Sequence, residues 1–287
     1  MKLIRKLFFI ICALLLVWLG IFTYNRVTDG FSIYQMSSSL PPCPQYEVEA
    51  TTAKKQELQE ILGQKFHYLG KGCQFYAFES EDGKYVLKFL KHKHLRLYQG
   101  LNALPLPSKL RALCDEKTER RKTRVELLFS SCKLAYEKMP EETGLVFIHL
   151  NRVPQLGKKV VLIDKMGCKH SVKIDNFEYV LQKRGRRLTE IFSQCTDSSE
   201  IVSTVQKLAD LVIMRCQKGV RDRDRSFVKN VALVDGTPIF IDIGQFYEDP
   251  SILSEEEQEK DVYKRFVDLQ FWAEQHFPQY APLFRVY

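Results

Sequence analysis

The chain has 287 residues, of which 45% are hydrophobic and 12% aromatic, so it can bury one sizeable core or two smaller lobes. Its eight cysteines form no C-x-x-C pair and no Cys/His ligand spacing, which argues against a zinc site and a disulfide framework. The formal net charge is +8, but residues 1–26 hold four basic residues and no acid, which leaves a mildly basic body at +4. We therefore expect no nucleic-acid partner.

An uncharged segment of eighteen residues, Leu7–Tyr24, follows a basic tail at residues 1–6. As a helix rising 1.5 Å per residue it spans roughly 27 Å, close to the thickness of a bilayer's hydrocarbon core. We predict a transmembrane helix here, and a cleaved signal peptide is the alternative. The segment is long for a signal peptide, and no A-x-A-like site follows Trp18-Leu19-Gly20, so a retained anchor is favoured.

Residues 25–51 contain Ser37-Ser38-Ser39 and Pro41-Pro42-Cys43-Pro44, a composition that predicts an extended linker. A short helix is expected over residues 53–62, where Leu58, Ile61 and Leu62 lie on one side.

A glycine turn and a lysine-bearing strand come next. Gly70 and Gly72 would let backbone N–H groups approach phosphate oxygens closely. After a hairpin turn at residues 81–84, the run Tyr85–Leu90 alternates so that Val86 and Lys88 share a face. A lysine within an apolar strand is costly unless an anion meets it, although a lysine on an edge strand can also serve to prevent aggregation.

From Lys84 to Arg124 the chain carries a net charge of +9. This segment could face anionic lipid or a phosphorylated substrate, or it could be a solvated helix face. Within residues 115–139 a helical stripe of apolar side chains is expected, made of Val125, Leu128, Phe129, Cys132, Tyr136 and Met139.

Strands are predicted at residues 144–150, 160–164 and 177–181, and a well-patterned helix at residues 198–217. The stretch after this helix places Asp224, Asn230 and Asp242 around two short apolar runs, which we expect to form a hairpin. Two oxygen ligands at one edge suit Mg²⁺, and the third group could act on a hydroxyl. Asp-rich turns also join strands without any chemistry. A last helix begins at the cap residue Ser254.

In this order, the motifs of residues 63–245 resemble the catalytic core of the protein-kinase-like superfamily. Gly219-Val220-Arg221-Asp222-Arg223-Asp224 is similar to the family's Gly-Ile-x-His-Arg-Asp, and Ile241-Asp242-Ile243-Gly244 resembles its hydrophobic-Asp-Phe-Gly. The resemblance implies an α+β, two-lobed kinase-like fold behind an N-terminal transmembrane helix. Residues 52–181 would form the first lobe, and residues 182–287 a hinge and a short second lobe.

The resemblance also implies a role for each site residue, with ATP and Mg²⁺ as cofactors. Asp224 would be the catalytic aspartate, with Asp222 as a fallback because Asp224 and Asn230 are six positions apart where the family has five. For the acid that pairs with Lys88, Glu126 is preferred to Glu119. The remaining roles are phosphate binding by Gly70, Gly72 and Lys88, and metal binding by Asn230 and Asp242.

The expected function is ATP–Mg²⁺-dependent phosphotransfer to a small or membrane-associated hydroxyl, such as one of a lipid or glycan. Only forty-three residues follow Gly244, and no Ala-Pro-Glu element is present, so a platform for peptide substrates is missing. A membrane-tethered pseudokinase that binds nucleotide or protein is the alternative, favoured by Phe75 at the family's third glycine position. The third possibility is an anchored protein of unrelated fold.

The membrane side of the body stays open at this point. The basic N-terminus predicts a cytoplasmic tail and a translocated body, whereas a nucleotide-using domain needs ATP on its own side.

Overall fold

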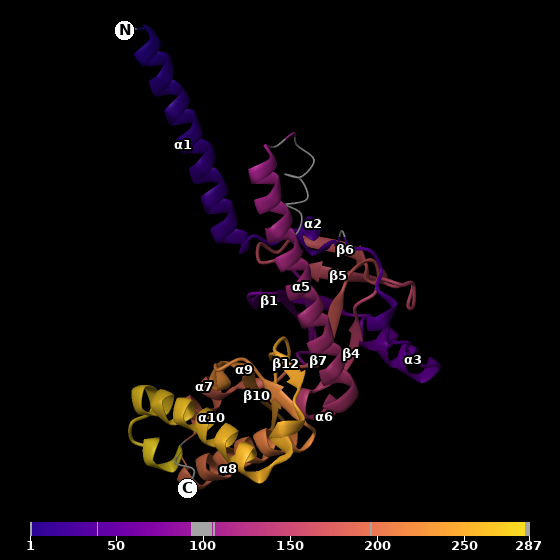
Figure 1. Cartoon of the computed structure of the whole chain (residues 1–287), viewed down its shortest axis with the longest axis vertical. Helices are drawn as coiled ribbons and strands as arrows, with labels where there is room; N and C mark the ends of the chain where they lie inside the picture. Colours follow the sequence, from indigo (N-terminus) through magenta and orange to yellow (C-terminus); the bar gives the residue numbers. More distant parts are fainter. Residues whose placement is uncertain (1, 39, 93–104, 106, 196, 285–287) are drawn as a thin grey trace.

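The computed structural model describes residues 2–38, 40–92, 105, 107–195 and 197–284. Figure 1 shows a sheet-rich lobe in the middle, a helical lobe at one end, and helix α1 (Lys2–Thr28) projecting from the other end. The predicted fold class, α+β and two-lobed behind an N-terminal apolar helix, is confirmed. The middle of the basic segment, residues 93–104, lies outside the described residues.

Helix α1 has the length and composition of a membrane span. Within Arg5–Thr28 a stretch of 18 residues reaches a mean hydropathy of 2.6, and none of that stretch is buried in the body. An N-terminal signal sequence would have the same properties.

The first lobe is built on a seven-stranded sheet with the order β4-β7-β3-β2-β1-β5-β6. All neighbours are antiparallel except β1 and β5. The strands are β1 (Lys65–Lys71), β2 (Phe75–Ser80), β3 (Tyr85–Leu90), β4 (Leu145–His149), β5 (Lys159–Ile163), β6 (Lys169–Lys173) and β7 (Tyr179–Lys183). The helices of this lobe are α3 (Thr52–Ile61), α5 (Ser108–Lys138), α6 (Pro140–Thr143) and the 3₁₀ turn η2 (Ile174–Asn176). Two hairpins, β1–β2 and β2–β3, therefore place the lysine strand β3 next to β2, the strand that follows the glycine turn.

Residues 25–51 are not an extended linker. They form α2 (Ile33–Met36) and the 3₁₀ turn η1 (Pro44–Tyr46), and they bury Phe31, Met36 and Tyr46. The ring of Phe31 meets the rings of Tyr76 and Phe78 edge-on, with 5.3 Å between centroids in both pairs. Three large apolar side chains thus outweigh the Ser and Pro content, because burying them removes substantial apolar surface from water.

The second lobe is mainly helical and includes the predicted hairpin, which is confirmed as β10 paired with β11. Its turn places Asp235 and Gly236 at φ values of 49° and 76°, as a tight two-residue hairpin turn requires. The strands are β8 (Arg186–Arg187), β9 (Val220–Asp222), β10 (Val231–Val234), β11 (Thr237–Phe240) and β12 (Phe246–Glu248). The helices are α7 (Leu188–Gln194), α8 (Ser198–Gln217), α9 (Phe227–Asn230) and α10 (Glu255–His276), with 3₁₀ turns η3 (Pro250–Leu253) and η4 (Ala281–Phe284).

The ends of the two long helices in this lobe are set by side-chain caps. Asp197 accepts a hydrogen bond from the N–H of Ser199 at the start of α8, and Ser254 accepts one from the N–H of Glu257 at the start of α10. Each cap satisfies an N–H group that has no partner inside its helix.

The lobes are joined at Gly185, between β7 and β8. A Cβ atom at this position would lie 2.6 Å from the Cβ of Ala232 and 3.3 Å from the carbonyl oxygen of Leu233. Because these are backbone or near-backbone atoms, they cannot rotate away. The approach of the hinge to β10 therefore requires glycine.

We expect Gly185→Ala to lower the free energy of unfolding by about 1–3 kcal/mol through overpacking. Chemical denaturation of the full chain in detergent would measure this loss. Gly70→Ala is the matched control, because no atom lies within 4 Å of the Cβ it would add. Equal unfolding midpoints for the two variants would contradict the proposed constraint.

Candidate active site

A cavity of about 510 Å³ lies between the glycine turn, β3, the hinge and the β10–β11 hairpin. This volume is in the range of pockets that hold small molecules and cofactors. The cavity brings together most of the residues predicted as a site: Gly70, Gly72, Lys88, Asn230 and Asp242. Asp224 and Glu126 do not line it.

Lys88 is held at the cavity wall by two hydrogen bonds. Its Nζ donates to Oε1 of Gln182 at 2.7 Å and to the carbonyl oxygen of Ile241 at 2.5 Å. Burial lowers the pKa of Lys88, while the nearby charge of Asp242 acts in the opposite direction. An ammonium group has three donors, so one remains for a ligand.

Gln182, which the sequence reading did not single out, fixes this arrangement. It is 1% exposed, and its Nε2 donates to the carbonyl oxygens of Thr143 at 2.5 Å and Phe240 at 2.9 Å. Since Oε1 accepts from Lys88, the amide is satisfied at both ends. In the sequence, the position of this amide at the end of an otherwise apolar strand, just before the hinge, could have indicated its role.

The structure separates Glu126 from Lys88, so the predicted ion pair is not formed. Glu126 is exposed on α5, and its backbone carbonyl accepts a hydrogen bond from the hydroxyl of Tyr46 at 3.3 Å. Glu119 also points to solvent, where it pairs with Lys122. At about 100° per residue, Glu126 lies on the opposite side of α5 from the buried Leu128.

Helix α5 instead presents Ser131 and Cys132 to the site. Ser131 Oγ donates to the carbonyl oxygen of Ile243 at 2.5 Å and accepts from the N–H of Phe246 at 2.6 Å. Cys132 is fully buried, and burial raises the pKa of its thiol to about 12, although the charge of Lys88 opposes this shift. The group facing Lys88 from this helix is therefore a neutral thiol rather than a carboxylate.

Asp224 lies on the loop between β9 and α9. Its Oδ1 accepts from the N–H of Ser226 at 2.8 Å, and its side chain also bonds to Asn230. Partial burial acts to raise the pKa of Asp224, but the hydrogen bonds from Ser226 and Asn230 outweigh it, so the pKa is lowered and the carboxylate stays ionised. The short helix α9 follows Asp224 and ends at Asn230, which lines the cavity.

The side chain of Asp222 holds this loop by a hydrogen bond to its backbone. Its side chain is 6% exposed, and its Oδ1 accepts from the N–H of Asp224 at 2.9 Å. Arg265 of α10 donates to the backbone carbonyl oxygens of both Asp222, at 2.6 Å, and Asp224. Arg265 lies close to Asp261, which also forms a buried ion pair with Arg215 of α8. Two helices thus hold the loop through buried charges.

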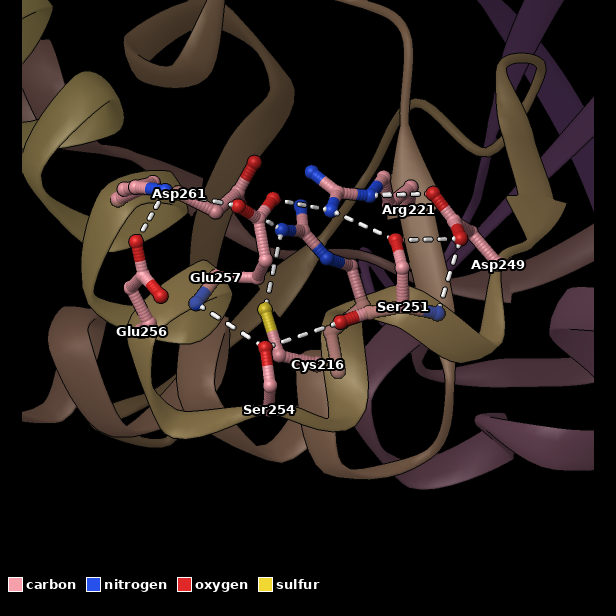
Figure 2. Close-up of polar contacts among 10 residues, drawn as sticks. Cys216, Arg221, Asp249, Ser251, Ser254, Glu256, Glu257 and Asp261 are labelled. Atoms are coloured by element: carbon pink, nitrogen blue, oxygen red, sulfur yellow. Dashed lines mark hydrogen bonds and ion pairs between the residues drawn. The ribbon is translucent and has the colours of Figure 1, made fainter.

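Arg221, one residue before Asp222, ties strand β9 to the rest of the lobe, as Figure 2 shows. Its guanidinium pairs with Asp249 and with Glu257, both at 2.6 Å, and donates to Oγ of Ser251 at 3.2 Å. The loop that carries Asp224 therefore follows a strand that Arg221 fixes to η3 and to α10.

The chemistry of the cavity suits a polyanion bound with a divalent cation. Its lining holds six basic side chains and two acidic ones: Lys71, Lys88, Lys183, Arg184, Arg187 and Lys229 against Glu190 and Asp242. Asp242 and Asn230 offer carboxylate and amide oxygens, which Mg²⁺ shares readily with phosphate oxygens. Among the described residues no group of three His, Cys, Asp or Glu side chains forms a metal cluster. A metal here would therefore depend on oxygen ligands from a bound phosphate or from water.

No known family profile matches the sequence, and no curated protein does. The chain is similar in structure to the Rv3197–erythromycin complex from Mycobacterium tuberculosis, at 15% identity and a TM-score of 0.36, over 80% of this chain and 59% of that one. It is also similar to WbdD, at 14% identity and a TM-score of 0.35, over 74% of this chain and 42% of that one. A third similar structure is the streptomycin–ATP complex of APH(2")-IIa, at 12% identity and a TM-score of 0.32, over 82% of this chain and 87% of that one. The chain spans less than two thirds of the first two, and at these identities the likeness concerns the fold alone.

Burial raises the pKa of Asp222 to about 6 from its ordinary 3.8, against the opposing charge of Arg265. Because the fold favours the protonated form, we expect the free energy of unfolding to fall as the pH rises from about 4 to 6, where the carboxyl of the unfolded chain is ionised while the folded one keeps its proton, and to level off above the folded pKa. From a shift of this size the loss is roughly 3 kcal/mol.

Denaturation of wild type and Asp222→Asn at pH 4 and pH 7 would test this assignment. The difference in stability between the two proteins should change with pH, since the amide does not titrate. A constant difference would show that Asp222 has an ordinary pKa in the folded protein.

Proposed function

We propose that the chain is an ATP–Mg²⁺-dependent phosphotransferase of the kinase-like type. The observation that carries the proposal is the single cavity in which a glycine turn, the lysine of β3 and the side chains of Asn230 and Asp242 meet. These elements come from both lobes, and the two farthest apart in the sequence, Gly70 and Asp242, are separated by 172 positions. Packing requirements alone give no reason for a half-buried lysine and a carboxylate to share this space.

In this proposal Lys88 binds the nucleotide phosphates with the donor that its two fixed hydrogen bonds leave over. Gly70 and Gly72 have no neighbouring atom within 4 Å of a Cβ position, so the turn leaves room for phosphate oxygens beside its backbone. Asn230 and Asp242 would hold the metal. A bound Mg²⁺ would neutralise charge on the phosphate oxygens.

Asp224 is the proposed catalytic aspartate, and it would orient or deprotonate the acceptor hydroxyl. Its carboxylate is ionised and partly exposed, whereas that of Asp222 is enclosed by Arg265 and the loop itself. We assign Asp222 to support rather than to catalysis.

The proposed acceptor is a hydroxyl of a small or membrane-associated molecule, such as a lipid or glycan. After Asp242 the described chain forms β12, η3, α10 and η4. The apolar side of α10, including Phe266 and Leu269, is buried in the core of the second lobe. This side of α10 is therefore not available to a polypeptide substrate.

We also propose that α1 is a retained single-pass anchor, that residues 52–181 and 182–287 are the two lobes, and that residues 25–51 belong to the first lobe in packing. The proposed function requires ATP on the side of the membrane where the body lies.

A second candidate is a pseudokinase, a tethered module that binds nucleotide without turnover. The observation that favours it is the neutral Cys132 opposite Lys88, where α5 contributes no carboxylate. Phe75 in place of a third glycine also lines the cavity and narrows the space beside the turn.

Nucleotide binding should depend on Lys88 and Asp242. ATP–Mg²⁺ at about 100 times its Kd would stabilise the wild-type fold by about 2.7 kcal/mol and raise its melting temperature. We expect Lys88→Met and Asp242→Asn each to abolish this rise. Lys264→Met, an exposed change on α10, is the matched control and should keep it. If both site variants respond like wild type, the site is assigned wrongly.

Turnover should depend on Asp224. We expect Asp224→Asn to keep its affinity for ATP but to lower phosphotransfer or ATP hydrolysis by roughly 10²–10⁴-fold, the usual contribution of a positioned acid or base. Single-turnover assays with labelled ATP would measure the change. Full activity in Asp224→Asn would remove it from the mechanism, and tight binding without turnover in wild type would favour the pseudokinase.

A further inference from the structure

The end of α1 is fixed to the first lobe by the residue that follows it. Asp29, with φ at 56°, ends the helix, and its Oδ2 accepts from the hydroxyl of Tyr68 at 3.2 Å and from Nζ of Lys165 at 3.1 Å. Its backbone carbonyl accepts from Nζ of Lys71 at 3.0 Å. Partial burial acts against the charge of Asp29, but the hydrogen bond and charge of Lys165 and the charge of Lys71 lower its pKa. The helix therefore meets β1 and the β5–β6 turn directly, without a flexible spacer.

The β5–β6 turn is built to display an apolar side chain between basic ones. Oδ1 of Asp164 accepts from the N–H groups of Met166 and Cys168, both at 2.9 Å, which fixes the turn. Met166 is 59% exposed, and Lys165 and Lys169 on either side are also exposed. An exposed methionine between lysines beside the end of an apolar helix suits the boundary between lipid tails and head groups.

The first turns of α5 repeat this pattern. Leu110 is 50% exposed and Leu113 is 51% exposed, and Lys109 and Arg111 lie beside them. No acidic residue occurs in the helix before Asp115. Figure 1 shows this end of α5 projecting beyond the sheet in the same direction as α1. Both apolar and basic side chains are thus presented on the side from which the helix leaves the body.

We propose that Ser108–Cys114 and Asp164–Lys169, together the membrane-facing surface, dock on a bilayer that contains anionic phospholipids. The inference rests on the proposed anchor but not on phosphotransfer. Three basic side chains, Lys109, Arg111 and Lys169, complement the negative head groups, and Leu110, Leu113 and Met166 enter the interface between them. Among the acids nearby, Asp29 binds Lys165, Asp164 binds His170 at 2.7 Å, and Glu116 binds Arg120 at 2.5 Å.

Docking in this way would set the position of the cavity. Lys71 both lines the cavity and donates to Asp29 at the end of α1. The glycine turn would therefore lie next to the bilayer surface, within reach of a hydroxyl on a lipid or a lipid-linked glycan.

Hydrogen exchange of the full chain in nanodiscs tests the proposal without relying on activity. One set of nanodiscs would contain phosphatidylcholine alone, and the other phosphatidylcholine with phosphatidylserine. Amides of residues 108–114 and 164–169 should exchange more slowly in the anionic set, by roughly threefold or more. Amides of α10, in the other lobe, should exchange equally in both.

The double variant Lys109→Glu with Lys169→Glu should lose the lipid-dependent protection, and the control Lys264→Glu should keep it. Equal exchange of the wild-type membrane-facing surface in both lipid sets would overturn the docking proposal, whatever the variants do. Failure of the chain to enter nanodiscs at all would overturn the anchor and the inference with it. Binding of nucleotide in either case would leave the proposed function standing.

Discussion

The amide of Gln182 is the contact on which the cavity depends. It donates to Thr143 at the end of α6 and to Phe240 at the end of β11, and it accepts from Lys88 on β3. These three partners belong to separate parts of the chain, and the amide is buried, so losing any one bond would leave a polar group unsatisfied. The spacing between the lobes and the orientation of Lys88 are therefore fixed by the same side chain. Close packing of Gly185 against Ala232 sets the same spacing on the other side of the hinge.

A second set of interactions, built around charged side chains, holds the loop of Asp224. Arg265 binds the loop's backbone carbonyl groups, and Asp261 joins Arg265 to Arg215. Buried ion pairs of this kind add little net stability compared with apolar packing, but removing one partner is costly. The arrangement is better explained as a means of holding a polar loop in one conformation beside the cavity.

Local sequence patterns predicted what depends on local structure. The β10–β11 hairpin follows from Asp235-Gly236 between apolar runs, and the position of Lys88 follows from alternation along one strand. The partner of Lys88 could not be predicted in the same way. Which side of α5 meets the site is decided by packing of Leu128 and Cys132 in the core, and that rotation turns Glu126 to solvent. Residues 25–51 were misread because a few buried side chains decided their structure against the average composition. Arg265, more than forty residues from Asp222, gave no local signal.

The most direct test of the central claim is a titration of the full chain in detergent with ATP, carried out once in the presence of Mg²⁺ and once in the presence of a chelator. The account predicts saturable binding of one nucleotide per chain, much tighter with Mg²⁺, since Asn230 and Asp242 can reach the phosphates only through the metal. Absence of binding under both conditions would contradict it. Binding of equal strength with and without Mg²⁺ would contradict the metal-binding role given to Asn230 and Asp242.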